Sequence, residues 1–166
     1  MAGPRRSRDP SKALGCHDRA LGLLSVRARS RGELEMRLLR AGFEVDEVRD
    51  ELERLEEVGL IDDEAFASTV ATHHLTVRGS GRRVVERELF AKGIDRGLIE
   101  RTLAGSDGDE TERAERLARE RARRLSNLPS ETAYARLVSF LGRRGYPAEV
   151  AHPAARRALD LAGTDE

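Results

Sequence analysis

The chain of 166 residues has no tryptophan, a single cysteine and only 4% aromatic residues. No proline occurs between Pro10 and Pro129. One cysteine, Cys16, cannot form an intramolecular disulfide, which excludes a disulfide-stabilised domain. With few rings, and without strands rich in alternating β-branched residues, the cores must be built from leucine, valine and alanine packed between helices. The sequence therefore predicts an all-α protein.

Long apolar runs are also missing. None reaches the roughly 18 residues that a helix needs to cross a bilayer, and no apolar signal-peptide core follows the basic N-terminus. We expect a soluble, cytoplasmic, monomeric protein without membrane contact, in which residues 1–17 form a disordered basic tail.

Charged residues make up 36% of the chain, and 30 basic residues balance 30 acidic ones. The balance hides a polarity along the sequence. Residues 1–31 carry 8 basic and 2 acidic residues, 32–64 carry 4 and 13, and 65–103 carry 7 and 4. This order favours a molecule with two electrostatic faces. Alternatively, the acidic block is a solvated helix face whose carboxylates pair with Arg49 and Arg54.

A helix-like stretch ends three times in glycine followed by a large apolar residue, at Gly42-Phe43, Gly93-Ile94 and Gly145-Tyr146. The glycines are 51 and 52 positions apart. Glycine takes the left-handed conformation that ends a helix, while the next residue folds back onto the last turn. A fixed period of this size is typical of repeat architectures, in which each unit stacks on its neighbours. Function should then lie on a long shared surface and not in one deep pocket.

Apolar spacing and turn residues divide the chain into three tandem three-helix units, about nine helices in all. The units span 18–60, 61–104 and 110–161, with a linker at 105–109 and a C-terminal tail at 162–166. Ser30 and Glu33 form a capping box at one helix start, and Ser130 is expected to cap another helix. Pro153 should kink or split the last helix.

The residue patterns of common catalytic and metal sites are missing. His73 and His74 are adjacent and point to different sides of a helix, so they cannot bind one ion together. Asp62-Asp63-Glu64 follows a glycine stop at a helix start, where carboxylates cap the helix. Gly79-Ser80-Gly81 lacks the lysine and the preceding strand of a phosphate-binding loop. We therefore expect no enzyme, no cofactor and no metal site.

The candidate binding residues are arginines beside the repeat landmarks. Those of the second unit lie at a helix start and along one helix side, and arginines in comparable stretches of the other units join them. The full set is Arg78, Arg82, Arg83, Arg87, Arg37, Arg40, Arg143 and Arg144. If the units stack with a constant rotation, these side chains line one strip that could bind phosphates or an acidic protein groove. Alternatively, arginine is simply the polar residue of a chain with only two lysines. Further arginines recur between positions 113 and 124, on the first helix of the third unit.

Four segments in this order resemble the RecX family of RecA recombinase regulators. They are SRGELEMRLLRAGF at 30–43, LERLEEVGLIDDEAFA at 52–67, RGSGRRVVERELFAKGI at 78–94 and LVSFLGRRGYPAEV at 137–150. The resemblance covers nearly everything from Asp18 to Leu159 and implies an elongated, curved molecule of three tandem repeats. It also implies a regulator that binds RecA filaments on DNA. Such proteins typically inhibit strand exchange, ATP hydrolysis and cleavage of the SOS repressor in DNA repair and homologous recombination.

Members of this family also contact single- or double-stranded DNA. Two departures affect these expectations: the stretch STVATHHLTV at 68–77 lacks the arginines and aromatics of the family, and Pro153 interrupts the closing helix.

An alternative function is a sequence-tolerant DNA-binding module that acts without the recombinase, and a third is a structural adaptor for another helical partner. Because aromatic residues are not interleaved with the basic ones, we expect any DNA contact to be electrostatic and salt-sensitive.

Overall fold

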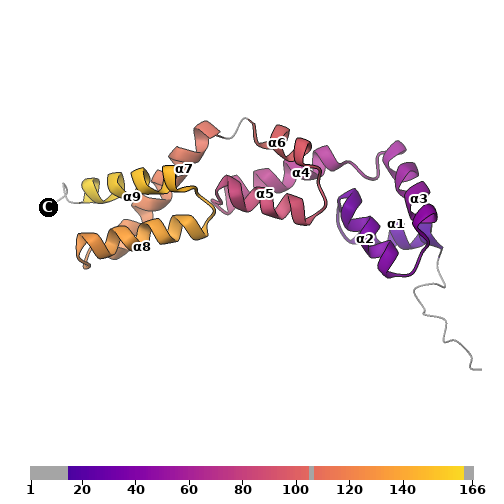
Figure 1. Cartoon of the computed structure of the whole chain (residues 1–166), viewed down its shortest axis with the longest axis horizontal. Helices are drawn as coiled ribbons and strands as arrows, with labels where there is room; N and C mark the ends of the chain where they lie inside the picture. Colours follow the sequence, from indigo (N-terminus) through magenta and orange to yellow (C-terminus); the bar gives the residue numbers. More distant parts are fainter. Residues whose placement is uncertain (1–14, 105–106, 163–166) are drawn as a thin grey trace, which may run out of the picture. The chain divides into compact units, whose positions relative to one another are not determined.

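A computed structural model describes residues 15–104 and 107–162, with side chains described for 15–104 and 110–160. Within these ranges the chain forms nine α-helices and no strand, which confirms the predicted all-α class (Figure 1). The expectations for residues 1–14, for Gly105 and Ser106 of the linker, and for 163–166 lie outside the described residues. Contacts divide the described chain into two compact units that differ from the three sequence repeats, and from here on "first unit" and "second unit" mean these two. The first takes the residues up to Phe66 together with Lys92–Ile94, and the second takes Ala67–Ala91 and the residues from Asp95 onward.

The first unit contains α1 Cys16–Val26, α2 Arg31–Arg40 and α3 Val45–Glu57. α1 begins two residues before the expected Asp18, so Cys16 is part of the helix and is buried. α2 begins where predicted, because the Ser30 hydroxyl accepts a hydrogen bond from the Glu33 amide at 3.2 Å. The core of this unit is closed by apolar side chains that are 0–1% exposed: Leu34, Leu38, Val48, Leu52 and Leu55.

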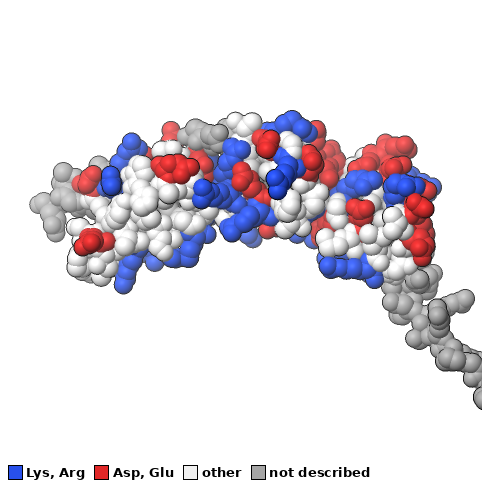
Figure 2. All heavy atoms as spheres, viewed as in Figure 1, with Lys and Arg blue, Asp and Glu red and all other residues white. Residues whose placement is uncertain are grey.

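Seven of the 13 acidic residues in the block at 32–64 lie on α3. Arg49 pairs with Asp46 at 3.1 Å and with Asp50 at 3.3 Å, and Arg54 approaches Glu51 at 3.7 Å. Figure 2 shows carboxylates gathered over this helix. The block is therefore, in part, the ion-paired helix face of the second interpretation.

The next helices are α4 Asp63–Thr72 with a π-helical turn at His73–Val77, α5 Arg82–Ala91 and α6 Arg96–Leu103. Asp62 accepts a hydrogen bond from the Ala65 amide at 2.9 Å, and Asp95 caps α6 in the same way. Val85 and Leu89 of α5 are fully buried, as their helical spacing predicts.

The last three helices pack together as α7 Asp107–Ala122, continued by a 3-10 turn at Arg123–Leu125, α8 Ser130–Arg143 and α9 Ala148–Ala162 (Figure 1). α7 begins three residues before the expected Glu110.

Two predictions for these helices are wrong. Ser130 does not cap α8, because it is already the first helical residue and the N-cap is Pro129, whose side chain accepts no hydrogen bond. The predicted split at Pro153 is also wrong, because α9 runs through this residue and the proline lies on the exposed side; a kink at Pro153 stays a prediction. The loss of one backbone N–H donor at Pro153 is tolerated because the opposite side of α9 is held in the core by alanines that are 0–2% exposed. They are Ala151, Ala154, Ala155 and Ala158.

The predicted helix stops have left-handed glycines, with φ of 88° at Gly42, 76° at Gly93 and 93° at Gly145. At Gly42, the amide of Phe43 donates to Leu38 O at 3.3 Å, and the glycine amide donates to Leu39 O at 2.9 Å. These two bonds satisfy carbonyls that the helix end leaves open. Gly145 ends α8 with the same pair of bonds.

Candidate functional site

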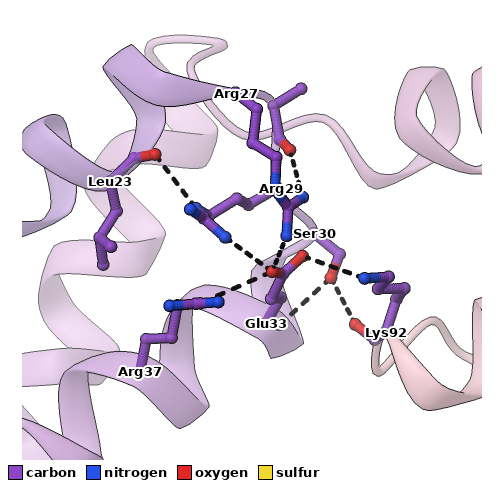
Figure 3. Close-up of polar contacts among 8 residues, drawn as sticks. Leu23, Arg27, Arg29, Ser30, Glu33, Arg37 and Lys92 are labelled. Atoms are coloured by element: carbon purple, nitrogen blue, oxygen red, sulfur yellow. Dashed lines mark hydrogen bonds and ion pairs between the residues drawn. The ribbon is translucent and has the colours of Figure 1, made fainter.

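The N-terminus of α2 packs against the glycine turn that follows α5. The Ser30 hydroxyl donates to the Lys92 carbonyl (Figure 3). The Arg31 amide donates to the Asp63 carboxylate at 2.8 Å. A Cβ on Gly32 would lie 2.9 Å from the Gly93 Cα, so the two backbones meet without room for a side chain. Of the acidic residues expected to cap α4, Asp63 thus serves α2 instead. We call this contact the first joint.

The N-terminus of α5 meets the glycine turn after α8 in the same manner. The Gly81 amide donates to Arg144 O at 2.8 Å, and the Arg82 amide donates to the Glu110 carboxylate at 2.7 Å. A Cβ on Gly81 would lie 2.5 Å from the Gly145 carbonyl. This second joint repeats the chemistry of the first: a close glycine pair, a donor to the carbonyl before the left-handed glycine, and a carboxylate on the first helical amide.

Glu33 is the centre of an ion-pair cluster at the first joint. Its Oε1 accepts from Arg27 and from Arg29, the latter at 2.7 Å, and lies 3.6 Å from Arg37 Nε (Figure 3). Lys92 Nζ lies 3.9 Å from Oε2, and that oxygen accepts no hydrogen bond from the described residues. Burial raises the pKa of Glu33, but the hydrogen bond from Arg27 and the charges of the surrounding cations outweigh it, so the pKa is lowered overall. In a full capping box the Glu33 carboxylate would also accept from the Ser30 amide. Here the carboxylate pairs with these cations instead.

The candidate arginines fall into two groups. Arg37 and Arg40 lie on α2 in the first unit; Arg37 belongs to the Glu33 cluster, and Arg40 is exposed. The other six lie in the second unit: Arg78, Arg82, Arg83, Arg87, Arg143 and Arg144. Whether the two groups share one strip stays a prediction.

Within the second unit, two arginines next to the second joint have partners in the fold. Arg144 donates to the Arg78 carbonyl, and Arg82 pairs with Glu86 at 2.8 Å. Arg83 and Arg87 are exposed on α5, one helical turn apart as predicted. They are therefore freer to contact a partner than Arg82, whose backbone and side chain both have structural roles.

An arginine cluster that the sequence analysis identified only in part, through Arg143 and Arg144, surrounds Phe140 on α8. The guanidinium carbons of Arg121 and Arg144 lie 5.5 and 5.3 Å from the centre of its ring, which is cation–π distance. Two adjoining surface depressions share Arg121 and Phe140, and they add Arg124, Arg136 and Arg143 to the cluster. We call these five arginines and Phe140 the Phe140 cluster. Figure 2 shows basic side chains gathered over the α5 and α8 part of this face.

For Arg121 and Arg124 the only sequence signal was the run of arginines between 113 and 124. That run did not show which arginines share a helix side with α8. Arg113 is buried in the same helix, whereas Arg121 and Arg124 are exposed. The cluster can bind phosphates or carboxylates through several guanidinium groups at once.

Other kinds of site find no support in the described part of the chain. It holds no group of three or more metal-ligating side chains. None of its helices has the length and apolar character needed to cross a membrane.

Comparison with known proteins matches the whole helical region. Models of the first, second and third three-helix domains of RecX match residues 16–55, 62–103 and 108–154. The chain is 40% identical over 156 residues to the regulatory protein RecX of Mycobacterium sp. (strain JLS), covering 90% of this chain and 85% of the relative. It is 44% identical over 138 residues to that of Mycolicibacterium smegmatis, covering 80% and 73%. The crystal structure of RecX from Lactobacillus salivarius superposes with a TM-score of 0.76 at 26% identity, covering 88% of this chain and 95% of that one.

Proposed function

The chain belongs to the RecX family of regulatory proteins, and on this premise we propose that it binds RecA filaments on DNA and inhibits the recombinase. Inhibition would extend to filament-dependent ATP hydrolysis and to cleavage of the SOS repressor, in the cytoplasm, during DNA repair and homologous recombination. The family is one of regulators, so the chain is not an enzyme.

The observation that carries this proposal is the match of all three RecX domains, in order, over residues 16–154. The geometry adds support. Left-handed glycines at the same place in each repeat confirm the repeat read from the sequence, and the second unit presents a basic surface from both α5 and α8. A filament on DNA offers phosphates and a repeating protein surface, and arginine suits both because its guanidinium binds oxyanions through two parallel hydrogen bonds.

The test is DNA-dependent ATP hydrolysis by the cognate RecA, with this protein added in increasing amounts. We expect the hydrolysis rate to fall at protein concentrations below that of the recombinase, since a bound regulator acts on filament growth. An unchanged rate at several-fold molar excess over the filament would reject the proposal.

A second candidate function is binding to DNA without the recombinase, and the Phe140 cluster favours it. Five arginines around one patch could neutralise on the order of four phosphates, so the affinity should fall steeply with salt. Fluorescence anisotropy with labelled duplex and single strands, between 50 and about 300 mM salt, separates the two functions. Micromolar affinity at physiological salt without recombinase supports the DNA module, whereas negligible binding leaves the filament as the target.

A further inference from the structure

Phe90 is an exposed aromatic side chain on α5. It is 61% exposed, although phenylalanine is mostly buried in folded proteins. Among the described residues of the second unit, Val77 is the other large apolar side chain with such exposure, at 72%. The guanidinium carbon of Arg96, at the start of α6, lies 5.7 Å from the centre of the Phe90 ring.

Phe90 lines a groove between α5 and α6. The groove holds about 390 Å³, within the range of ligand pockets. Ile99, 6% exposed, contributes an apolar side chain to its wall, and the remaining lining comes from Glu86, Arg87, Arg96 and Glu100. An apolar floor beside arginines is the composition of energetically important spots in protein interfaces, where aromatic residues and arginine are enriched.

The charges of the groove are unequal. Glu86 is already paired with Arg82 at 2.8 Å, so its charge is largely compensated. Besides Glu86, one carboxylate lines the groove, that of Glu100, and it stands against the two positive charges of Arg87 and Arg96. The groove therefore favours a partner with negative charge and at least one apolar side chain.

A protein segment fits these features better than a nucleic acid. Arg96 covers one face of the Phe90 ring, which reduces the area on which a base could stack. The two depressions of the Phe140 cluster are lined by five arginines and two glutamates, Glu120 and Glu131, and they offer phosphates a more basic surface in the same unit.

We propose that the groove between α5 and α6 docks a short acidic segment of a partner protein. An apolar side chain of that segment packs on Phe90 and Ile99, while its carboxylates pair with Arg87 and Arg96. The inference rests on the proposed function in one respect, since it takes the recombinase filament as the partner.

A direct test uses a probe peptide and does not depend on the recombinase. The peptide Glu-Asp-Leu-Phe-Asp-Glu is titrated into the isotope-labelled full chain, and amide chemical shifts are followed by NMR. We expect saturable shifts confined to α5 and α6, at about millimolar peptide, and no shifts with Lys-Lys-Leu-Phe-Lys-Lys. Shifts that are absent, that occur elsewhere, or that are equal for the two peptides would overturn the docking site.

A second test compares the Phe90→Ala variant with Val77→Ala, a matched truncation of the other exposed apolar side chain. We expect Phe90→Ala to raise the concentration for half-maximal inhibition of RecA ATP hydrolysis about tenfold, and Val77→Ala to change it less than twofold. Arg96→Glu should act like Phe90→Ala, and it keeps the test valid if truncation of Phe90 disturbs the fold. DNA affinity without recombinase should stay unchanged in all three variants.

The outcomes separate the two proposals. If the native chain does not inhibit, the proposed function fails, and the peptide titration alone decides the groove. If the native chain inhibits and both groove variants inhibit equally well, the docking site is wrong while the proposed function stands. A loss of DNA affinity in Phe90→Ala that parallels the loss of inhibition would make the groove a nucleic-acid surface and would also overturn the inference.

Discussion

Glu33 is approached by four cationic side chains, from Arg27, Arg29, Arg37 and Lys92. The sequence predicted Glu33 as a capping residue, and the Ser30 half of that prediction is confirmed. Arg37 lies at the i,i+4 spacing that the local sequence reveals. Lys92 lies 59 positions away, and Arg29 lies before the helix and is placed by its own bond to the Leu23 carbonyl, so their approach to Glu33 depends on the fold.

Replacing Glu33 with glutamine should lower the free energy of unfolding by about 3 kcal/mol at pH 7, since the buried Arg29 loses its partner. Because the folded pKa of Glu33 lies below its ordinary 4.5, the carboxylate stabilises the fold fully above that pH, and the stabilisation is lost as the pH falls through the folded pKa. Urea unfolding of both proteins between pH 3 and about 7 measures this. A difference between native and variant that does not shrink toward pH 3 would contradict it.

Cys16 should be chemically inert in the folded protein. Burial, together with the carboxylates of Glu47 and Glu51, raises the pKa of its thiol to about 11. Only on the order of 0.1% of the thiol is then ionised at pH 8, and the thiolate is the reactive form. We expect an aromatic disulfide reagent to label the native chain far more slowly than the chain in guanidinium chloride. Equal rates in the two conditions would show that Cys16 is accessible.

At the scale of helices, glycine has two distinct roles in this chain. Gly42, Gly93 and Gly145 provide the left-handed conformation that ends a helix, and their spacing made the repeat readable. Gly32 and Gly81 are needed for a different reason, since another backbone lies against them. A close approach between two backbone segments that are distant in sequence leaves no pattern in the local sequence. The sequence analysis therefore predicted the helix-ending role of glycine and missed its role at close backbone contacts.

The two joints give a stability prediction with an internal control. Gly81→Ala places a methyl group 2.5 Å from the Gly145 carbonyl, and backbone cannot move aside, so we expect a loss of about 3 kcal/mol. Gly22→Ala introduces the same methyl group inside α1, where nothing lies within 4 Å, and should raise stability by up to about 1 kcal/mol. Thermal unfolding of both variants measures whether the two stability changes have opposite signs. A Gly81→Ala variant as stable as the native chain would refute the close approach.

The two errors in the last helices differ in kind: Ser130 is already the first helical residue of α8, whereas the error at Pro153 has a tertiary cause. Serine is a strong capping residue and proline a strong breaker, so local preference indicated a cap at Ser130 and a break at Pro153. Packing decided otherwise, because the buried alanine face of α9 keeps the helix continuous. Helix propensity describes the preference of a single residue, whereas the burial of one whole face of α9 stabilises about four helical turns together.

At the scale of the molecule, the sequence identified the three repeats and the use of arginine, but not which arginines come together. Arg83 and Arg87 share a helix side, which periodicity reveals. The Phe140 cluster joins α7 with α8, and only their packing places Arg121 beside Arg144 and Phe140.

The Phe140 cluster predicts a measurable salt dependence. The double variant Arg136→Ala, Arg143→Ala should weaken duplex binding and reduce the log–log slope of affinity against salt by about 2, one unit for each lost phosphate contact. The control is Arg49→Ala, Arg54→Ala on the acidic α3, which should leave the slope unchanged. Anisotropy titrations at four salt concentrations suffice, and equal slopes for the two double variants would argue against the cluster as the DNA contact.

The N-termini of α2, α5 and α8 differ in one respect. Gly32 is the second residue of α2 and Gly81 directly precedes α5, and each lies so close to the backbone of a left-handed glycine turn that no side chain fits between them. At the start of α8, Pro129, Ser130 and Glu131 carry side chains and are exposed. The start of α8 therefore lacks the glycine on which such a backbone contact depends, and its side chains face solvent.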